Sequence, residues 1–308
     1  EQAAPEAFSM LSALGKRLYF PKGILAQGAE AKTKGKRFNA TIGIATEGPE
    51  PMYLPSIHRS LNNVSVDGAG DCGAPGGRPK LREVWREKQL AADPSMRGKN
   101  VGLPIVTAAI THGLFVMGDL FVDEGDIILA PDQLWDNYSL TFETRMGARI
   151  ETFPLYSGNG FNVQGFADAL REQGKKKNKL IVLLNFPNNP TGYMPTPAEG
   201  KGIVAALEAA AKAGTRLVVV CDDAYFGLFY HLGGASLTES LFGALCNLHR
   251  NILPIKLDGA TKELFVWGLR CGFLTFGLGH TENAQAALDA LDAKARAEIR
   301  SAISNSPM

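Results

Sequence analysis

Short apolar runs alternate with amphipathic helical patterns from about residue 80 onward. Runs that are apolar at every position, such as Leu180–Leu184 and Leu217–Cys221, are typical of strands buried on both faces. Strands that alternate with helices predict an α/β fold with a mostly parallel, doubly wound sheet. The predicted strands are Ile127–Ala130, Arg149–Phe153, Leu180–Asn185, Leu217–Asp222, Ile252–Leu257 and Gly272–Phe276.

Helical patterns lie between these strands, and one helix has clear boundary signals. Thr196 and Glu199 form a capping box, Pro197 follows at the first helical position, and Gly214 ends the pattern. The predicted helices are Leu81–Leu90, His112–Phe121, Trp135–Met146, Asn162–Gln173, Pro197–Ala213, Thr238–Leu248 and a terminal helix over Ala284–Ile303. The first 55 residues, rich in Gly, Lys and Pro, predict an irregular arm with one short helix near Ala7–Leu18.

Charge and composition exclude several classes of protein. The chain has 308 residues, with 32 Lys plus Arg against 31 Asp plus Glu, whereas nucleic-acid binding needs a basic excess. No apolar run is long enough to span a bilayer, so no membrane partner is expected. The four cysteines form no CxxC pair, which predicts no metal site and no disulfide framework. Reduced thiols indicate a cytoplasmic protein.

Three segments carry the candidate chemistry, and each lies at or just beyond the carboxyl end of a predicted strand. They are Asn185–Gly192 (Asn-Phe-Pro-Asn-Asn-Pro-Thr-Gly), Asp222–Tyr225 (Asp-Asp-Ala-Tyr), and Lys262 followed eight residues later by Arg270 and then Gly272. Each alone has an ordinary explanation as a loop, a cap or a solvated lysine. Open α/β sheets bind ligands at this edge, so the three together predict one ligand site.

Taken in this order, the three segments resemble the aspartate aminotransferase family of pyridoxal-phosphate enzymes (class I/II, fold type I). The motifs that carry the resemblance are Asn-Pro-Thr-Gly, Asp-x-Ala-Tyr and Lys-x7-Arg-x-Gly, and the resemblance extends from about Asn39 to Met308. The resemblance implies a three-layer fold with a seven-stranded, mostly parallel sheet, and a homodimer with active sites at the subunit interface. It also implies an N-terminal arm over 1–55, a large cofactor-binding domain over 56–280, and an interdomain helix with the start of a small domain over 281–308.

The resemblance assigns roles to the residues of the three segments. Lys262 would form a Schiff base with the aldehyde of pyridoxal 5'-phosphate and then move the substrate's α-proton. Asp222, chosen over Asp223 because the family has one residue between Asp and Ala, would hold the pyridine nitrogen protonated. Tyr225 and Asn189 would hydrogen-bond the phenolic oxygen, and Arg270 would bind the phosphate.

Further positions follow from the same resemblance. Trp135 would stack on the cofactor ring, although it could instead be a core tryptophan. Ile110 and Thr111 would bind phosphate at the start of a helix, and Thr261 beside the lysine would assist. Asn189 and Gly43 would contact the substrate.

The chain departs from the family pattern at three places. Gly259 stands where many relatives carry a phosphate-binding serine. Cys72 falls near the position of a tyrosine that reaches the neighbouring subunit's phosphate. The arginine for the substrate carboxylate would lie beyond Ile303, so we expect a partial chain, or else a truncated homologue without normal activity.

The predicted activity is transfer of an amino group from an amino acid to a 2-oxo acid. Two alternatives stay open at this stage. A lyase or decarboxylase would use the same cofactor residues, and an aminotransferase-like module would bind the cofactor without turnover.

Overall fold

The computed structural model divides by its internal contacts into two compact units, Glu1–Val64 and Ser65–Met308. The domain boundaries expected after residues 55 and 280 stay predictions. None of the helices formed by the described residues is long and apolar enough to cross a membrane. The structure describes residues 9–18, 24–35, 41, 43, 45–48, 50–61, 63, 73–230 and 235–303.

The first unit contains more regular structure than the predicted arm with one helix. Its elements are α2 (Ala13–Arg17), α3 (Ile24–Lys34), the hairpin strands β1 (Thr46–Glu47) and β2 (Glu50–Pro51), and α4 (Pro55–Leu61). Helix α3 was not predicted from the sequence, although its alanines and lysines are good helix formers. An i,i+4 ion pair between Glu30 and Lys34 supports its last turn.

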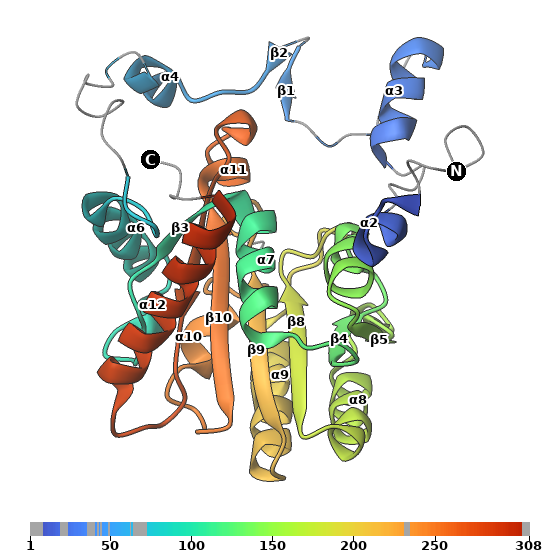
Figure 1. Cartoon of the computed structure of the whole chain (residues 1–308), viewed down its shortest axis with the longest axis vertical. Helices are drawn as coiled ribbons and strands as arrows, with labels where there is room; N and C mark the ends of the chain where they lie inside the picture. The colour runs from blue at the N-terminus through green and yellow to red at the C-terminus, as the bar shows by residue number, and fades with distance from the viewer. Residues whose placement is uncertain are drawn as a thin grey trace. The chain divides into compact units, whose positions relative to one another are not determined.

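In the described part of the second unit, seven strands form one sheet (Figure 1). Its spatial order is β3 (Ile105–Ala108), β11 (Cys271–Phe276), β10 (Ile252–Gly259), β9 (Arg216–Asp222), β8 (Lys179–Asn185), β4 (Ile127–Pro131) and β5 (Arg149–Phe153). The strands β10, β9, β8, β4 and β5 are parallel, while β11 is antiparallel to both of its neighbours. This arrangement confirms the predicted seven-stranded, mostly parallel sheet.

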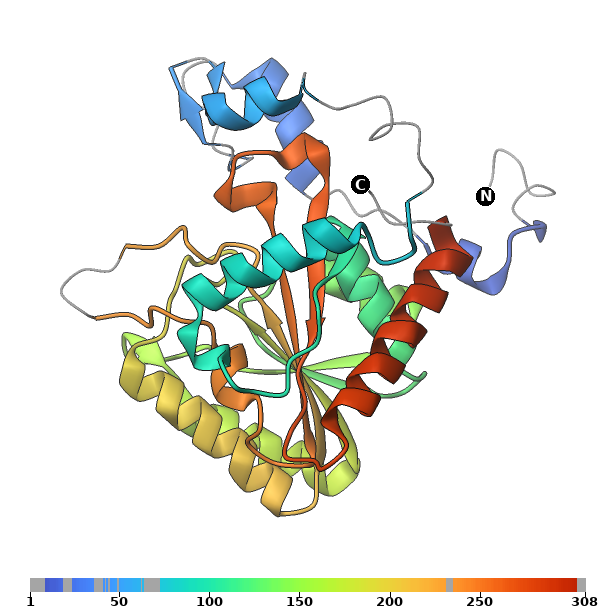
Figure 2. The ribbon, with the colours of Figure 1, turned by 90° about the vertical axis from the view of Figure 1, so that its left-hand side faces the viewer.

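Alternate residues of each central strand enter different cores on the two faces of the sheet. On β8, Leu180 and Val182 pack into one core with α8 (Val163–Lys176), α9 (Pro197–Lys212) and α10 (Leu241–Leu245). Ile181 and Leu183 pack into the other core with α7 (Ala109–Phe121) and α12 (Ala284–Ile303). Figure 2 shows α9 and α12 on opposite sides of the sheet, which confirms the three-layer architecture.

The predicted helices differ from the structure mainly where the sequence gives weak boundary signals. The capping box of Thr196 and Glu199 is present at the start of α9. The helix predicted over Trp135–Met146 is a short π-helix, η2 (Ser139–Arg145), and the one over Thr238–Leu248 shortens to α10. The remaining helical segments are α6 (Pro79–Ala92), η1 (Pro94–Met96), α11 (Ala260–Glu263) and η3 (Trp267–Leu269), and a second hairpin joins β6 (Tyr156–Ser157) to β7 (Gly160–Phe161).

A buried ion cluster joins four elements on the face of β10 that lies away from α7. Lys256, only 2% exposed, places its Nζ 2.9 Å from Asp93 Oδ2 and also donates to Asp223. Asp93, at the end of α6, accepts the backbone N–H of Ser240 at the start of α10. Although burial alone lowers it, the Asp223 and Asp93 carboxylates raise the pKa of Lys256, which therefore stays charged.

We expect Lys256→Met to lower the free energy of unfolding by about 3–5 kcal/mol, because two buried carboxylates lose their cation. Urea unfolding monitored by circular dichroism measures this loss. The matched control is Lys212→Met, whose exposed ammonium pairs with Glu208 at 2.7 Å and should matter by only about 0.3–0.5 kcal/mol. Equal losses in the two variants would contradict a stabilising role for the cluster.

Candidate active site

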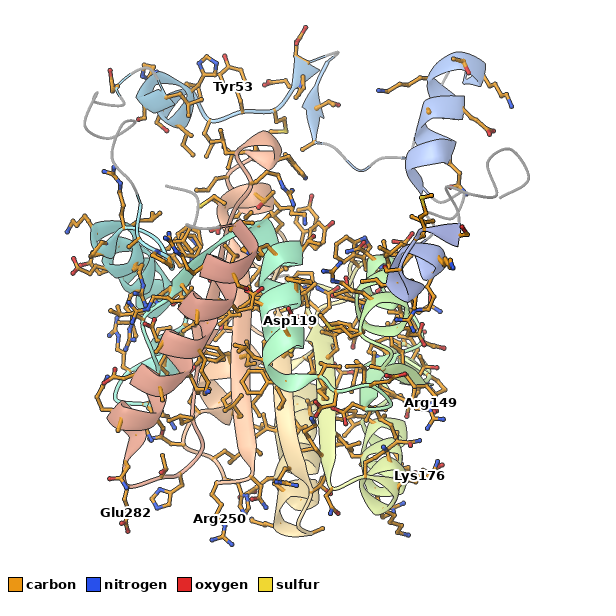
Figure 3. The ribbon with its side chains drawn as sticks, in the orientation of Figure 1. Tyr53, Asp119, Arg149, Lys176, Arg250 and Glu282 are labelled. Carbon is orange, nitrogen blue, oxygen red and sulfur yellow. The ribbon has the colours of Figure 1, made fainter. Side chains whose placement is uncertain are left out.

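The topology of the sheet brings the ends of several strands to one edge. Strands β3, β4, β8, β9 and β10 all finish there, and β11, which runs the other way, begins there. The helix α11 lies at this edge, whereas Arg250, which precedes β10, is labelled at the opposite edge in Figure 3. Residues just after five strands and just before a sixth can therefore face one space.

One cavity of about 170 Å³ occupies this edge and contains all nine predicted cofactor residues of the second unit. Gly43 belongs to the first unit, so its substrate contact stays a prediction. Cys72 lies outside the described residues. The predicted residues that line the cavity are Ile110, Thr111, Trp135, Asn189, Asp222, Tyr225, Thr261, Lys262 and Arg270.

Asp222 ends β9 and is 1% exposed, so its carboxylate has little water around it. Its Oδ1 accepts the backbone N–H of Ala224 at 3.1 Å, and its Oδ2 accepts the hydroxyl of Tyr138. Burial raises the pKa of Asp222, while these two hydrogen bonds and the nearby Lys262 ammonium oppose that rise.

Asp223 lies on the other side of the sheet and does not line the cavity. Its backbone N–H donates to the carbonyl of Leu257 at 2.8 Å, and its carboxylate pairs with Lys256. Neighbouring residues at the end of a strand point to opposite faces, which separates the two carboxylates. Only Asp222 is therefore placed to act on a ligand in the cavity.

Lys262 lies in the short helix α11 that directly follows β10. Its Nζ is 4.8 Å from the centre of the Tyr225 ring. Burial lowers the pKa of Lys262, the Asp222 carboxylate opposes this effect, and the Arg270 guanidinium adds to it. A lysine with a lowered pKa has a larger unprotonated fraction at neutral pH, which is the form that attacks carbonyl carbons.

The other end of the cavity suits an anion. Ile110 and Thr111 lie in the first turn of the 13-residue helix α7, where backbone N–H groups have no partner within the helix. Arg270 lines the same cavity and adopts a left-handed backbone conformation with φ of 50°. The hydroxyl of Thr261 donates to the Cys271 carbonyl at 3.1 Å, so it is already engaged.

Two glycines allow the close backbone approach that forms this end of the cavity. A Cβ on Gly272 would lie 2.6 Å from the carbonyl carbon and 2.7 Å from the Cα of Ala109, at the start of α7. A Cβ on Gly259 would lie 2.6 Å from the Cys271 carbonyl oxygen. A serine at position 259 would therefore require the backbone to shift.

Two polar side chains of the cavity, those of Asn185 and Tyr138, were not assigned a role from the sequence. Asn185 donates from Nδ2 to the Asp222 carbonyl at 2.8 Å and accepts the Asn189 N–H at 2.6 Å, so it joins two of the loops. Tyr138 binds Asp222 and packs edge-on against Trp135, with ring centres 5.5 Å apart. The i,i+3 spacing of Trp135 and Tyr138 in a predicted helix was the signal that could have found the tyrosine.

The family model for aminotransferase class I and II matches residues 72–299. The chain therefore belongs to the class I and II aminotransferase family, and the family resemblance of its motifs is confirmed. It is 24% identical over 260 residues to an aspartate aminotransferase of Bacillus sp. (strain YM-2), which covers 82% of this chain and 60% of that enzyme's length. A second aspartate aminotransferase, from Musicola paradisiaca (strain Ech703), is 32% identical over 171 residues, 55% of this chain and 39% of its own length.

Solved structures share the fold. An aminotransferase from Anaerococcus prevotii DSM 20548 superposes with a TM-score of 0.82 and 21% identity, covering 96% of this chain and 73% of that chain. An aromatic-amino-acid aminotransferase from Burkholderia pseudomallei, covalently bound to pyridoxal phosphate, superposes with a TM-score of 0.69 and 21% identity, covering 97% of this chain and 73% of that chain.

We expect Gly272→Ala to lower the free energy of unfolding by about 1–3 kcal/mol, because the new methyl group would overlap the backbone of Ala109. Gly268→Ala is the matched control four residues away, since a Cβ there meets no atom within 4 Å. Chemical denaturation of both variants is the measurement. If the two variants unfold at the same denaturant concentration, the close approach of β11 to α7 is not a constraint.

Proposed function

We propose that the protein is an aminotransferase that uses pyridoxal 5'-phosphate to move an amino group from an amino acid to a 2-oxo acid. The observation that carries the proposal is one cavity with a lysine of lowered pKa, a buried carboxylate and an anion site. Family membership supports the same chemistry. The chain spans 60% of the length of the first curated relative, so the activity of the whole protein is part of the proposal.

The side chains of the cavity fit this cofactor group by group. An aldehyde suits the Lys262 amine, a basic ring nitrogen suits the Asp222 carboxylate, and a phosphate suits Arg270 with the start of α7. The indole of Trp135 offers a flat apolar surface for an aromatic ring. Each chemical group of pyridoxal phosphate therefore has a counterpart among the residues of the cavity.

When bound, the cofactor supplies an aldehyde for condensation with an amine and an aromatic ring that accepts the electron pair of a broken bond at the α-carbon. Lys262 would hold the cofactor through its aldehyde. The Lys262 amine, when free, would act as the base that takes up the substrate's α-proton and gives it back. Its lowered pKa favours the unprotonated form that this step needs.

Three further side chains support this proton transfer. Asp222 would hold a proton on the ring nitrogen of the cofactor, which makes such a ring a better acceptor of electrons. Burial, and then the Asp222 charge, raise the pKa of Tyr225, so its phenol stays protonated and would donate a hydrogen bond to the phenolic oxygen of the cofactor. Asn189, in the loop after β8, would supply a second donor.

The proposal includes assembly as a homodimer, which the family resemblance implies. Association could cover exposed large apolar side chains of the second unit, which include Val84 (45%), Leu103 (46%), Leu269 (47%) and Ile303 (44%).

We expect the full-length protein with pyridoxal phosphate to develop a visible absorbance band, and borohydride to fix the cofactor to Lys262. Lys262→Ala should abolish the band and the covalent label, since the attacking amine is gone. Lys176→Ala is the control, because this lysine is exposed on α8, pairs with Glu172 and does not line the cavity. Figure 3 labels it toward the edge of the sheet opposite α11. A band that persists in Lys262→Ala would contradict the assignment.

Asp222→Asn should keep the cofactor attached but lower kcat for amino transfer by roughly 10²–10³-fold, the usual effect of losing one group that stabilises the transition state. Asp136→Asn, an exposed residue beside Trp135, is the control and should react at the normal rate. The assay follows keto-acid-dependent amino transfer together with release of ammonia and carbon dioxide. Ammonia or carbon dioxide without transfer would indicate a lyase or decarboxylase, and an attached cofactor without any turnover would indicate a binding module.

A further inference from the structure

Tyr138 is a buried phenol that the proposed mechanism does not use. It is 2% exposed, and its hydroxyl donates to Asp222 Oδ2. The two residues come from different parts of the chain, since Tyr138 follows β4 and Asp222 ends β9, and β8 lies between these strands in the sheet.

The ring of Tyr138 has little freedom to turn away from Asp222. Trp135 packs edge-on against one side with ring centres 5.5 Å apart. Phe142, on the next turn of the same segment, packs nearly parallel with ring centres 6.4 Å apart. Packing of this kind fixes the direction of the hydroxyl, so the hydrogen bond to Asp222 is held in place without a large loss of side-chain freedom.

Tyr138 and Asp222 have complementary needs, because the buried carboxylate requires a donor and the phenol keeps its proton. Asp222 is buried, and an ionised carboxylate in such a place needs hydrogen-bond donors or a countercharge. Burial, and then the Asp222 charge, raise the pKa of Tyr138 well above that of a free phenol, so Tyr138 donates at every working pH. Each oxygen of Asp222 thus has a donor, Tyr138 at Oδ2 and Ala224 at Oδ1.

We propose that Tyr138 is a positioning residue whose O–H bond to Asp222 Oδ2 fixes the direction of this carboxylate and keeps it charged in the cavity. This inference rests on the proposed function, in which a charged Asp222 is required. One short segment then supplies two parts of the site, because Trp135 lines the cavity as a flat surface and Tyr138 acts through Asp222.

Tyr138→Phe tests the role because it keeps the ring and removes only the hydroxyl. Asp222 would retain the single donor Ala224, so its pKa would rise and a larger fraction would be protonated at any given pH. We expect the cofactor still to attach to Lys262, and kcat to fall about ten- to a hundredfold with little change in KM. The acid limb of the kcat profile should move to higher pH by about one unit or more.

Tyr193→Phe is the matched control. It also removes a tyrosine–carboxylate hydrogen bond, from Tyr193 to Glu199 at 2.8 Å, but outside the cavity. It should leave the pH profile unchanged. In an Asp222→Asn background, Tyr138→Phe should cause little further loss of kcat, because both substitutions act through the Asp222 carboxylate.

Unfolding of the cofactor-free protein gives a readout that does not depend on activity. The folded pKa of Asp222 is already above its unfolded value, and loss of Tyr138 raises it further. The loss of unfolding free energy in Tyr138→Phe should therefore be largest at a pH above the folded pKa of Asp222, and it should shrink as the pH falls through that pKa. The deficit of Tyr193→Phe should not shrink in this way.

The outcomes separate the two proposals. If the unchanged protein carries out transamination and Tyr138→Phe keeps the same kcat, pH profile and unfolding behaviour, the role of Tyr138 is overturned and the proposed function stands. If the unchanged protein does not attach the cofactor at Lys262, the proposed function fails. In that case, a loss of unfolding free energy in Tyr138→Phe that does not vary with pH would also refute the role of the Tyr138–Asp222 hydrogen bond.

Discussion

The site depends on two ionisable groups, the Lys262 amine and the Asp222 carboxylate, that line one cavity at the edge of the sheet. Burial favours the uncharged form of each group, which serves the lysine and works against the aspartate. In the proposed reaction, the lysine must lose its proton to attack, whereas the aspartate must keep its charge to act on a ring nitrogen. The hydrogen bonds from Tyr138 and Ala224 resolve this conflict, because they favour only the charged form of Asp222.

The fold places these groups through constraints that lie outside the cavity. On the far face of the sheet, Lys256 holds Asp223 and Asp93, and so joins the end of β9 to α6. At the cavity edge, Gly272 lets β11 approach the start of α7, so that Arg270 and the first turn of that helix line the same cavity. A change at either place would therefore disturb the site without touching a ligand.

Much of the fold and site could be predicted where local chemistry and tertiary structure agree. The fully apolar strands β8 and β9 and the capping box of α9 were found because burial and capping leave clear patterns. Strand β3 was missed because four residues carry too little periodicity, and its place is fixed by pairing with β11. Tyr138 and Asn185 were not given roles because their partner, Asp222, is distant in sequence, and only the folded chain brings them together.

The central claim is that Lys262 is an amine with a lowered pKa that captures an aldehyde. The most direct measurement is borohydride trapping of pyridoxal phosphate over a series of pH values, with mass spectrometry of the labelled peptides. The account predicts that the label lies on Lys262 and reaches half its maximum at a pH below that of a free lysine, about 10.4. Labelling that is spread over exposed lysines, and that reaches half its maximum at the pKa of a free lysine, would contradict this claim.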